Sequence, residues 1–183
     1  WYITYANDVS GSWETETLIN STRIFAIDRH PSIAVDSSDN IHISFYGDDN
    51  ISKKSCFIYA TGKTDNWVYE PVAAQNLKDY FVKTSISVDS QGIAHISYSV
   101  SSEIKYATNA SGHWMSETIE SNIYHPFPAI VVDSSDKVHI VYLTNLGLRY
   151  ATKAKGSWTI ETIDPYIYPE SDISIAVDSS DHI

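Results

Sequence analysis

The stretch Ser-Ile-Ala-Val-Asp-Ser-Ser-Asp-Asn-Ile-His-Ile-Ser at residues 32–44 decides the fold, because the chain repeats it. Related stretches occupy residues 85–97, 129–141 and, in shortened form, 174–183. A Tyr-Ala pair and a tryptophan precede each copy, and the four repeated tryptophans are spaced 54, 47 and 44 residues apart. A period of about 40–50 residues is typical of propeller blades and of some helical arrays. The sequence therefore predicts a repeat protein.

The third copy indicates most clearly that each unit consists of β-strands. Residues 104–108 alternate apolar and polar side chains, residues 109–112 have turn chemistry, and residues 113–119 return as a second strand. The run at 129–132 is typical of a strand covered on both faces, and residues 138–142 alternate again. Four short antiparallel strands per unit form a propeller blade. No helical amphipathic pattern appears, and a β-solenoid is the main competing architecture.

Turn and proline positions agree with this interpretation. Asp136 stands where the second copy has Gly92, which indicates a turn position chosen for its backbone conformation. No proline is expected inside a strand core. The prolines are expected at strand ends or in irregular stretches, at Pro31, Pro126, Pro128, Pro165 and Pro169.

Two motifs resemble a known family. The patterns Tyr-Ala-Thr-(x)n-Gly-x-Trp-x-x-Glu-Thr-Ile and Ser-Ile-Ala-Val-Asp-Ser-Ser-Asp-x-Ile-His-Ile-Ser are similar to β-propeller repeats of bacterial and archaeal secreted or surface proteins, with NHL- or BNR-like blades. The resemblance covers essentially all 183 residues. It implies a fold and leaves the activity open, because propellers host binding, scaffolding and many chemistries.

We predict an all-β fold, a β-propeller of about four repeats of four-stranded antiparallel blades, in a chain that starts and ends mid-blade. The chain is expected to be a single domain or part of a larger propeller. The resemblance implies that the Ile-Ala-Val strand is innermost and the Trp strand outermost. The predicted repeats are 1–36, 37–89, 90–133 and 134–178, with the start of a further blade at 179–183.

The two ends are expected to supply three strands of one further blade, since the chain opens on a third strand at 2–5 and closes after an inner strand at 174–177. Either the ends pair around a ring that lacks one strand, or the ring is larger and its other blades come from further sequence or from a second copy. A homo-oligomer that completes the ring is therefore one expected partner. A start at Trp1 in place of methionine favours a processed product or a fragment.

Charge and composition narrow the other partners. Twelve basic and twenty-three acidic residues give a net charge of −11, which disfavours nucleic acid and anionic membrane surfaces. No apolar run approaches the ~20 residues of a membrane helix, so no membrane insertion is expected. The single cysteine, Cys56, excludes an intramolecular disulfide framework. Thirteen tyrosines on an acidic background favour an extracellular or cell-surface location.

Ligand-binding residues are expected in the loops that differ most between copies. These loops lead from the Glu-Thr strand to the Val-Asp strand and from the His-Ile strand to the next Tyr-Ala pair, and both sets emerge on one face of the propeller. Their aromatic side chains suit stacking on sugar rings, although single members of the set can instead pack between blades. The candidates are Arg29, His30, Tyr80, Phe81, Tyr124, His125, Phe127, Tyr166 and Tyr168.

The residues that repeat in every copy are interpreted as structural. His42, His95 and His139 lie one per blade, so they are expected to make hydrogen bonds instead of converging on one metal ion. The four repeated tryptophans are predicted to lie in the blade cores. Two carboxylates per turn fall short of the six or more oxygens that calcium takes, so no metal and no cofactor is predicted.

No catalytic residue is assigned. The three arginines, Arg23, Arg29 and Arg149, fall in two different repeats, and the Asp-box of sialidase-like propellers is missing, as are a nucleophile elbow and zinc-ligand spacing. We therefore predict a non-catalytic extracellular module that recognises glycans or proteins through its aromatic-rich loops. Two alternatives stay open: a structural or assembly module with no small-molecule site, and a fragment of a carbohydrate-active enzyme that uses, for example, His125 and Tyr124.

Overall fold

The computed structural model describes residues 3–18, 24–26, 30–49, 54–63, 66–74, 82–124, 126–154, 156–167 and 172–183. The regular elements in these ranges are the strands β1 (Thr4–Asn7), β2 (Glu14–Thr17), β3 (Ile24–Ala26), β4 (Ser32–Val35), β5 (Ile41–Asp49), β6 (Lys54–Lys63), β7 (Asn66–Ala74), β8 (Thr84–Val88), β9 (Ala94–Val100), β10 (Glu103–Thr108), β11 (Met115–Ser121), β12 (Phe127–Val132), β13 (Val138–Thr144), β14 (Gly147–Ala154) and β15 (Ser157–Asp164). Nothing in the described ranges forms a helix that is long and apolar enough to cross a lipid bilayer.

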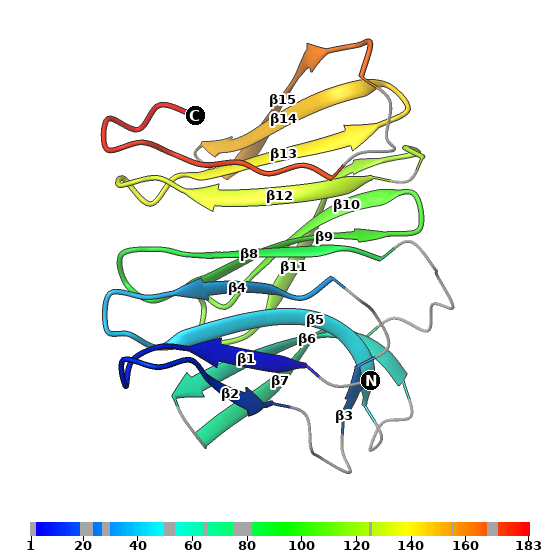
Figure 1. The fold of residues 1–183 in the computed structure, drawn as a ribbon. Coiled ribbons are helices and arrows are strands. Elements are labelled where there is room, and N and C mark those ends of the chain that lie inside the picture. Colours follow the sequence, from blue (N-terminus) through cyan, green and yellow to red (C-terminus); the bar gives the residue numbers. More distant parts are fainter. Residues whose placement is uncertain are drawn as a thin grey trace.

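Three complete blades follow one another along the chain, which confirms the predicted all-β propeller architecture. The first blade is β4–β5–β6–β7, the second is β8–β9–β10–β11 and the third is β12–β13–β14–β15, and neighbouring strands are antiparallel. The short β3 extends the first sheet by pairing with the end of β5. β1 and β2 form a separate two-stranded sheet. Figure 1 shows the three blades stacked along the molecule, with β1 and β2 beside the first blade.

The third and fourth strands of every blade share one irregularity. The register between them shifts once, near the start of the third strand, and such a bulge increases the local twist of the sheet. The shifts fall between Phe57 and Ile58, between Ile104 and Lys105, and between Leu148 and Arg149. Because the bulge recurs at the same place, the three blades have the same twist and can stack on one another.

Pro71 contradicts the expectation that no strand core contains proline, whereas Pro128 lies near the start of its strand, in agreement with its predicted place at a strand end. Pro71 lies inside β7, opposite Ile58 and beside the bulge, and Pro128 is the second residue of β12. Both β7 and β12 are edge strands of their sheets, so the missing N–H of proline removes no ladder hydrogen bond on the unpaired side. The sequence pattern does not distinguish an edge strand from a central one.

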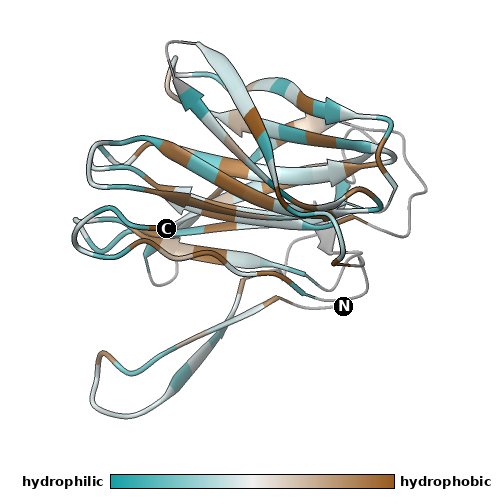
Figure 2. Ribbon diagram, turned by 90° about the horizontal axis from the view of Figure 1, so that it is seen from above, coloured by the Kyte–Doolittle hydropathy of each residue, from teal (hydrophilic) through white to brown (hydrophobic). Residues whose placement is uncertain are grey.

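The hydrophobic core lies between blades, where the face of one sheet packs on the face of the next. The interface between the first and second blades contains Phe57 and Tyr98, whose ring centroids are 4.3 Å apart. The interface between the second and third blades contains Ile104 and Tyr142, and Leu18 of the β1–β2 unit packs on the first blade. Figure 2 shows hydrophobic and hydrophilic bands alternating along the strands, as expected for sheets with two unlike sides.

Three of the four repeated tryptophans occupy these interfaces, and one does not. Trp67, Trp114 and Trp158 are half-buried, and each packs on the repeated tyrosine of the preceding blade at ring centroid distances of 6.2, 5.0 and 5.2 Å. Trp13 is 76% exposed, so the prediction that it lies in a blade core is wrong. The physical reason is positional, because no described blade precedes the β1–β2 unit to cover this side chain.

The innermost strands of neighbouring blades lie next to one another around the propeller axis. The backbone N–H of Ile130 in β12 donates to Ser85 Oγ in β8 at 3.2 Å, and that of Val132 donates to Ser87 Oγ at 3.1 Å. The predicted fourth inner strand at 174–177 is not assigned as a strand. No described residue pairs with its backbone, although its side chains alternate between exposed and half-buried as in a strand.

The turn after each inner strand has the predicted backbone. Gly92 has a φ of +78°, and Asp39, Asp136 and Asp181 at the equivalent positions have φ values of 60°, 61° and 61°. Aspartate tolerates this left-handed conformation better than most side chains do. The choice between glycine and aspartate at this position is thus set by backbone geometry, as the sequence indicated.

Candidate functional site

The described parts of the variable loops in the second and third blades lie at one end of these blades. The segment that follows β11 places the N–H of Ile123 3.1 Å from the carbonyl of Ser102, in the β9–β10 turn of the same blade. The next residue, Tyr124, donates its N–H to Asn145 Oδ1 of the third blade at 2.9 Å. Both kinds of connection therefore meet at the same end of neighbouring blades. We call this end the loop face.

The structure places four of the nine candidate ligand-binding residues on or near this face. Tyr124 and Tyr166 project into solvent and are 61% and 84% exposed, while His30 is exposed and Phe127 is half-buried. The other five lie outside the described residues: Arg29, Tyr80, Phe81, His125 and Tyr168.

A hollow of about 340 Å³ opens on the loop face where the inner strands begin. Its wall is formed by the starts of β4, β8 and β12 and by residues 172–175, so each of the four inner segments contributes to it. We call it the axial pocket. Its size lies within the range of small-molecule sites. Its polar lining includes His30, Ser32, Lys83, Ser85, Asp172 and Ser174.

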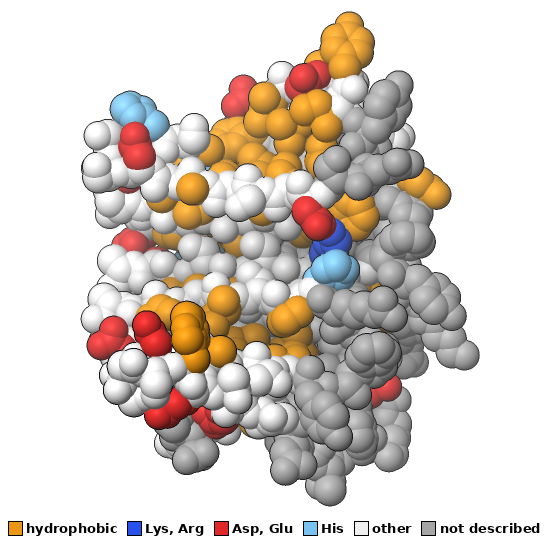
Figure 3. Space-filling model, viewed as in Figure 1, with side chains coloured by type: hydrophobic (Ala, Val, Ile, Leu, Met, Phe, Trp, Pro, Cys, Tyr) orange, Lys and Arg blue, Asp and Glu red, His pale blue; other side chains and the backbone are white. Residues whose placement is uncertain are grey.

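Lys83 is the most strongly held charged group in the axial pocket. Its ammonium donates a hydrogen bond to Asp172 Oδ1 and lies 4.2 Å from the centroid of the Phe127 ring. The hydrogen bond from Lys83, with the charges of Lys83 and His30, holds the pKa of the Asp172 carboxyl below its usual range. Figure 3 shows Lys or Arg, His and Asp or Glu side chains meeting beside the hollow in the middle of the molecule.

The sequence predicted His30 and Phe127 at this site and missed Lys83 and Asp172. These two residues are separated by 89 positions, and each reads in isolation as an ordinary charged residue before a strand. No signal in the sequence pairs them. The prediction for Phe127 also needs correction in one respect: because Lys83 covers one face of its ring, that face is not free to stack on a ligand.

Arg149 has a role between blades and not on the loop face. Its guanidinium donates to Glu120 Oε1 at 3.0 Å, and Tyr142 donates to the other oxygen of the same carboxylate at 2.6 Å. Burial and the neighbouring Glu120 raise the pKa of Tyr142. The bonds join β11 of the second blade to β13 and β14 of the third. Arg23 and Arg29 lie outside the described residues.

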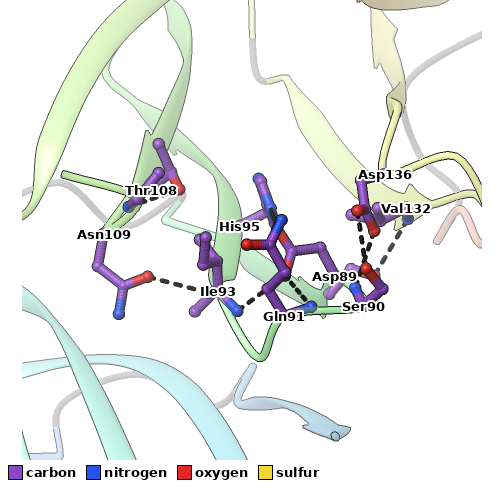
Figure 4. A network of polar contacts seen from close by, with 12 residues as sticks. Asp89, Ser90, Gln91, Ile93, His95, Thr108, Asn109, Val132 and Asp136 are labelled. Atoms are coloured by element: carbon purple, nitrogen blue, oxygen red, sulfur yellow. Dashed lines mark hydrogen bonds and ion pairs between the residues drawn. The ribbon is translucent and has the colours of Figure 1, made fainter. Parts of the chain in front are cut away.

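The repeated histidines form one hydrogen-bonded relay per blade, which confirms their predicted structural role. In each relay a tyrosine hydroxyl lies 2.6 Å from the histidine Nδ1, and an aspartate Oδ2 lies 3.3, 3.2 or 2.9 Å from Nε2. Figure 4 shows Asp89 and His95 of the second relay. The relays are Asp36–His42–Tyr59, Asp89–His95–Tyr106 and Asp133–His139–Tyr150.

The surroundings of the relays define the proton positions. Burial raises the pKa of Asp36, but hydrogen bonds from Asn40, Ser38 and His42 outweigh it, so the pKa lies well below its usual range and the carboxylate is ionised. Burial lowers the pKa of His95, and its hydrogen bond with Asp89 offsets this only in part. His95 is therefore neutral near pH 7, with its proton on Nε2 facing the carboxylate and Nδ1 accepting from the tyrosine.

The lowered pKa of His95 predicts that acid destabilises the protein before its carboxylates protonate. In the unfolded chain this side chain binds a proton near its ordinary pKa of 6.5, whereas the folded protein binds it only at lower pH. Because the unfolded state then binds more protons, the free energy of unfolding is fully present above 6.5 and falls as the pH decreases below it. Urea unfolding between about pH 8 and 5 measures this slope.

The variant His95→Asn is expected to reduce the slope, whereas His113→Asn, at an exposed turn position, serves as the matched control and leaves it unchanged. A free energy of unfolding that stays constant or rises between about pH 7 and 5 would contradict the assignment.

Within the described ranges, no group of three or more histidine, cysteine, aspartate or glutamate side chains is placed to hold a metal ion. The paired carboxylates of the turns make hydrogen bonds to the backbone and to neighbouring blades. Asp133 Oδ1 accepts the backbone N–H groups of Ser135 and Lys137 at 2.9 and 2.9 Å, and Asp136 accepts from Ser90 of the neighbouring blade.

The sequence matches no family model and no curated protein, so the NHL- or BNR-like character of the blades stays a prediction. Among solved structures, AofleA from Arthrobotrys oligospora is 15% identical, with a TM-score of 0.54 over 85% of this chain and 48% of AofleA. An AofleA mutant with three arginines replaced by alanine gives a TM-score of 0.56 with the same coverage. A fucose lectin from Kordia zhangzhouensis in complex with methyl-fucoside is 15% identical, with a TM-score of 0.49 over 72% of this chain and 96% of the lectin.

These likenesses concern the fold. The chain spans about half the length of AofleA, and at 15% identity the match shows a shared arrangement of strands and no shared ligand. It agrees with the stacking of antiparallel blades described above.

Proposed function

We propose that this protein is a non-catalytic, extracellular or cell-surface propeller module that binds glycans through its loop face. The observation that supports this most directly is the axial pocket, a hollow of about 340 Å³ that is lined by charged and hydroxyl side chains from three inner segments and by apolar side chains from the start of β12. A sugar presents many hydroxyl groups on a small apolar ring, so a polar pocket with aromatic side chains beside it suits this ligand class.

The side chains divide the work of recognition between the pocket and its rim. Lys83 presents hydrogen-bond donors and Asp172 presents acceptors, and the two groups form an ion pair in which Lys83 is largely buried and Asp172 is exposed. Tyr124 and Tyr166 stand exposed further out on the loop face, each with a flat ring and a hydroxyl. A chain of several sugars is therefore expected to contact the pocket and at least one rim tyrosine together.

Substitution of Lys83 by alanine is expected to weaken glycan binding at least about tenfold, because it removes the donor and leaves Asp172 without its partner. Tyr124→Ala and Tyr166→Ala are expected to weaken binding about three- to tenfold each, through lost stacking. A glycan array that includes fucosylated glycans identifies the ligand, and calorimetry with the best glycan measures the affinities.

His113→Ala is the matched control, since this exposed side chain lies in the β10–β11 turn at the opposite end of the blade. It is expected to bind as the unsubstituted protein does. Absence of binding to every glycan on the array, or binding that none of the loop-face substitutions affects, would reject the proposal in favour of a protein ligand or an assembly role.

A further inference from the structure

Neighbouring blades are joined by a contact between their turns. The Ser90 N–H and hydroxyl of the second blade both donate to the Asp136 carboxylate of the third blade, each at 2.8 Å, and Figure 4 shows this pair. Ser134 of the third blade donates in the same way to Asp181 in the next turn, at 3.0 and 2.7 Å. In both contacts a serine of one turn donates to the left-handed aspartate of the following turn, and the turn at Gly92 has no aspartate to make the equivalent contact with the first blade.

A second contact joins the inner strands. The N–H of Ile86 in the second blade donates to Ser32 Oγ in the first at 3.1 Å, and the N–H of Ile130 in the third donates to Ser85 Oγ in the second at 3.2 Å. The serine lies four residues before the relay aspartate, and the isoleucine lies three residues before it in the following blade. This contact therefore has a fixed place in the repeat.

A third contact joins the outer strands. Trp67 donates its indole N–H to Glu16 Oε1 of the β1–β2 unit at 2.9 Å and packs on Tyr5. Trp114 of the second blade donates to Glu70 Oε2 of the first at 2.8 Å and packs on Tyr59. The direction is the same in both cases, since each tryptophan reaches back to the preceding blade. Trp158 of the third blade packs on Tyr106 in the same way, but its indole N–H has no hydrogen-bond partner among the described residues.

Each of the three contacts joins one residue of a preceding blade to one residue of the following blade, and each end of the stack presents only one of the two partners. One end presents the residues that a following blade contributes, which are Asp39, Ile33 and Trp13. The other end presents the residues that a preceding blade contributes, which are Ser179, Ser174 and Glu161. The Asp39 carboxylate and the side chains of Trp13, Ser174, Ser179 and Glu161 are exposed, and none of them hydrogen-bonds to another described residue.

The first of these ends also leaves apolar surface uncovered. Ile33 and Val35 of β4 are 52% and 59% exposed, whereas the equivalent Ile86 of β8 is buried by the first blade. A hollow of about 260 Å³ runs between β1 and the β4–β5 pair and is lined by Ile3, Ile33 and Ile43. The first blade therefore packs on Ile3 and Leu18 of the β1–β2 unit, whereas its inner strand β4 has no described inner strand of a preceding blade against it.

We propose that a second copy of this chain docks head-to-tail across these ends. Asp39 then caps Ser179 of the partner subunit, the N–H of Ile33 donates to Ser174 of the partner subunit, and Trp13 donates to Glu161 of the partner subunit. All three contacts run in the same direction from one blade to the next. A single orientation of the second copy therefore satisfies them together. Each set of end residues is the repeat's own counterpart to the other, so the two ends of a second copy are complementary to the two ends of the first.

The docking forms a composite blade from residues 172–183 of one copy and β1–β2 of the next. The three contacts are heterologous, so each copy keeps both kinds of end, and the assembly closes into a ring where the rotation between copies allows it. A complete blade has a second strand between its inner strand and its third strand. The composite blade has no such strand, so the edge of β1 that would pair with it stays unpaired.

The test is a disulfide that forms only between copies in the proposed sense. An Asp39→Cys chain and a Ser179→Cys chain, mixed under mild oxidation, are expected to give a cross-linked species of twice the 20.5 kDa of one chain. Neither chain alone is expected to give it. Cys56 is buried and does not compete. Sedimentation of the unsubstituted chain is expected to show the same dimer, or larger closed assemblies, without cross-linking.

The equivalent pair inside one chain calibrates the geometry. A Ser90→Cys/Asp136→Cys chain is expected to close its disulfide intramolecularly, since these side chains are hydrogen-bonded at 2.8 Å. Asp8→Cys, on the exposed β1–β2 turn, replaces Asp39→Cys in the negative control. The proposal is wrong if the intramolecular disulfide forms but the Asp39→Cys and Ser179→Cys chains do not cross-link. It is also wrong if the Asp8→Cys chain cross-links to the Ser179→Cys chain to the same extent. A chain that sediments only as a monomer overturns it as well.

Discussion

Replacement of Tyr98 by alanine is expected to lower the free energy of unfolding by about 4 kcal/mol, because it empties the interface between the first two blades. Tyr98 is completely buried, and its ring lies 4.3 Å from the Phe57 ring of the preceding blade. Its hydroxyl also bonds to Ser116 in β11. The surrounding sheets are held by their own ladders and cannot collapse into the space, so the cavity persists.

Urea unfolding followed by tryptophan fluorescence measures this loss, and Tyr98→Phe separates its two components. The phenylalanine variant keeps the ring and removes only the hydroxyl, so its cost is expected to be about 1 kcal/mol. Most of the free energy lost in Tyr98→Ala is therefore expected to come from the aromatic ring. A cost for Tyr98→Ala that equals the cost for Tyr98→Phe would show that blade stacking does not depend on this side chain.

Substitution of Gly147 by alanine is expected to cost more than about 4 kcal/mol and to disrupt the third blade. A Cβ atom at this position would lie 2.2 Å from the carbonyl oxygen of Asp164 and 2.6 Å from Pro165 Cα. These are backbone atoms at the end of β15, which cannot rotate aside as a flexible side chain does. The residue also has a φ of +100°, which side-chain-bearing residues rarely adopt.

Gly112→Ala is the matched control for Gly147→Ala. Gly112 has a φ of +80° in an open turn, and an added Cβ there meets no atom within 4 Å. Its substitution is expected to cost only the backbone penalty of about 1–2 kcal/mol. Chemical denaturation of both variants gives the comparison. Equal costs would mean that the close approach of Asp164 is relieved by a small backbone shift.

Both predictions bear on the loop face, because that face is positioned by the blades beneath it. The turn at Gly147 follows Asn145, whose side chain accepts the N–H of Tyr124. Disruption of the turn is therefore expected to displace the rim of the proposed glycan site, whereas Gly112→Ala, at the opposite end of the blade, leaves it in place. Glycan affinity of the two variants gives a second readout of the same distinction.

The repeat allowed most of the fold to be predicted, since a residue type that recurs at one position in every copy has one structural reason. The left-handed turn at Gly92 and Asp136 and the hydrogen-bonded histidines, such as His95, followed from this logic. The logic failed for Trp13, which shares the repeat position of Trp67 and has no preceding blade to cover it. The prediction of an inner strand at 174–177 failed for a related reason. A strand needs a hydrogen-bonded neighbour, and no described strand pairs with these residues.

The candidate site was predictable only in part. The variable, aromatic-rich loops led to His30 and Phe127, which line the axial pocket. Lys83 and Asp172 were not foreseen, because their ion pair depends on inner segments from different repeats meeting at one axis. A contact between single, non-repeated residues leaves no periodic trace in the sequence.

The amino-acid sequence by itself determined the blade: its four strands, its turns and its hydrogen-bonded histidines. This information is local, because alternation and turn chemistry act over a few residues and the repeat states them several times. Only the tertiary structure decided which of the repeated positions are satisfied, which side chains line the axial pocket and which end surfaces are left uncovered. These depend on how sheets stack in three dimensions, where each blade's environment is set by its neighbours and not by its own residues.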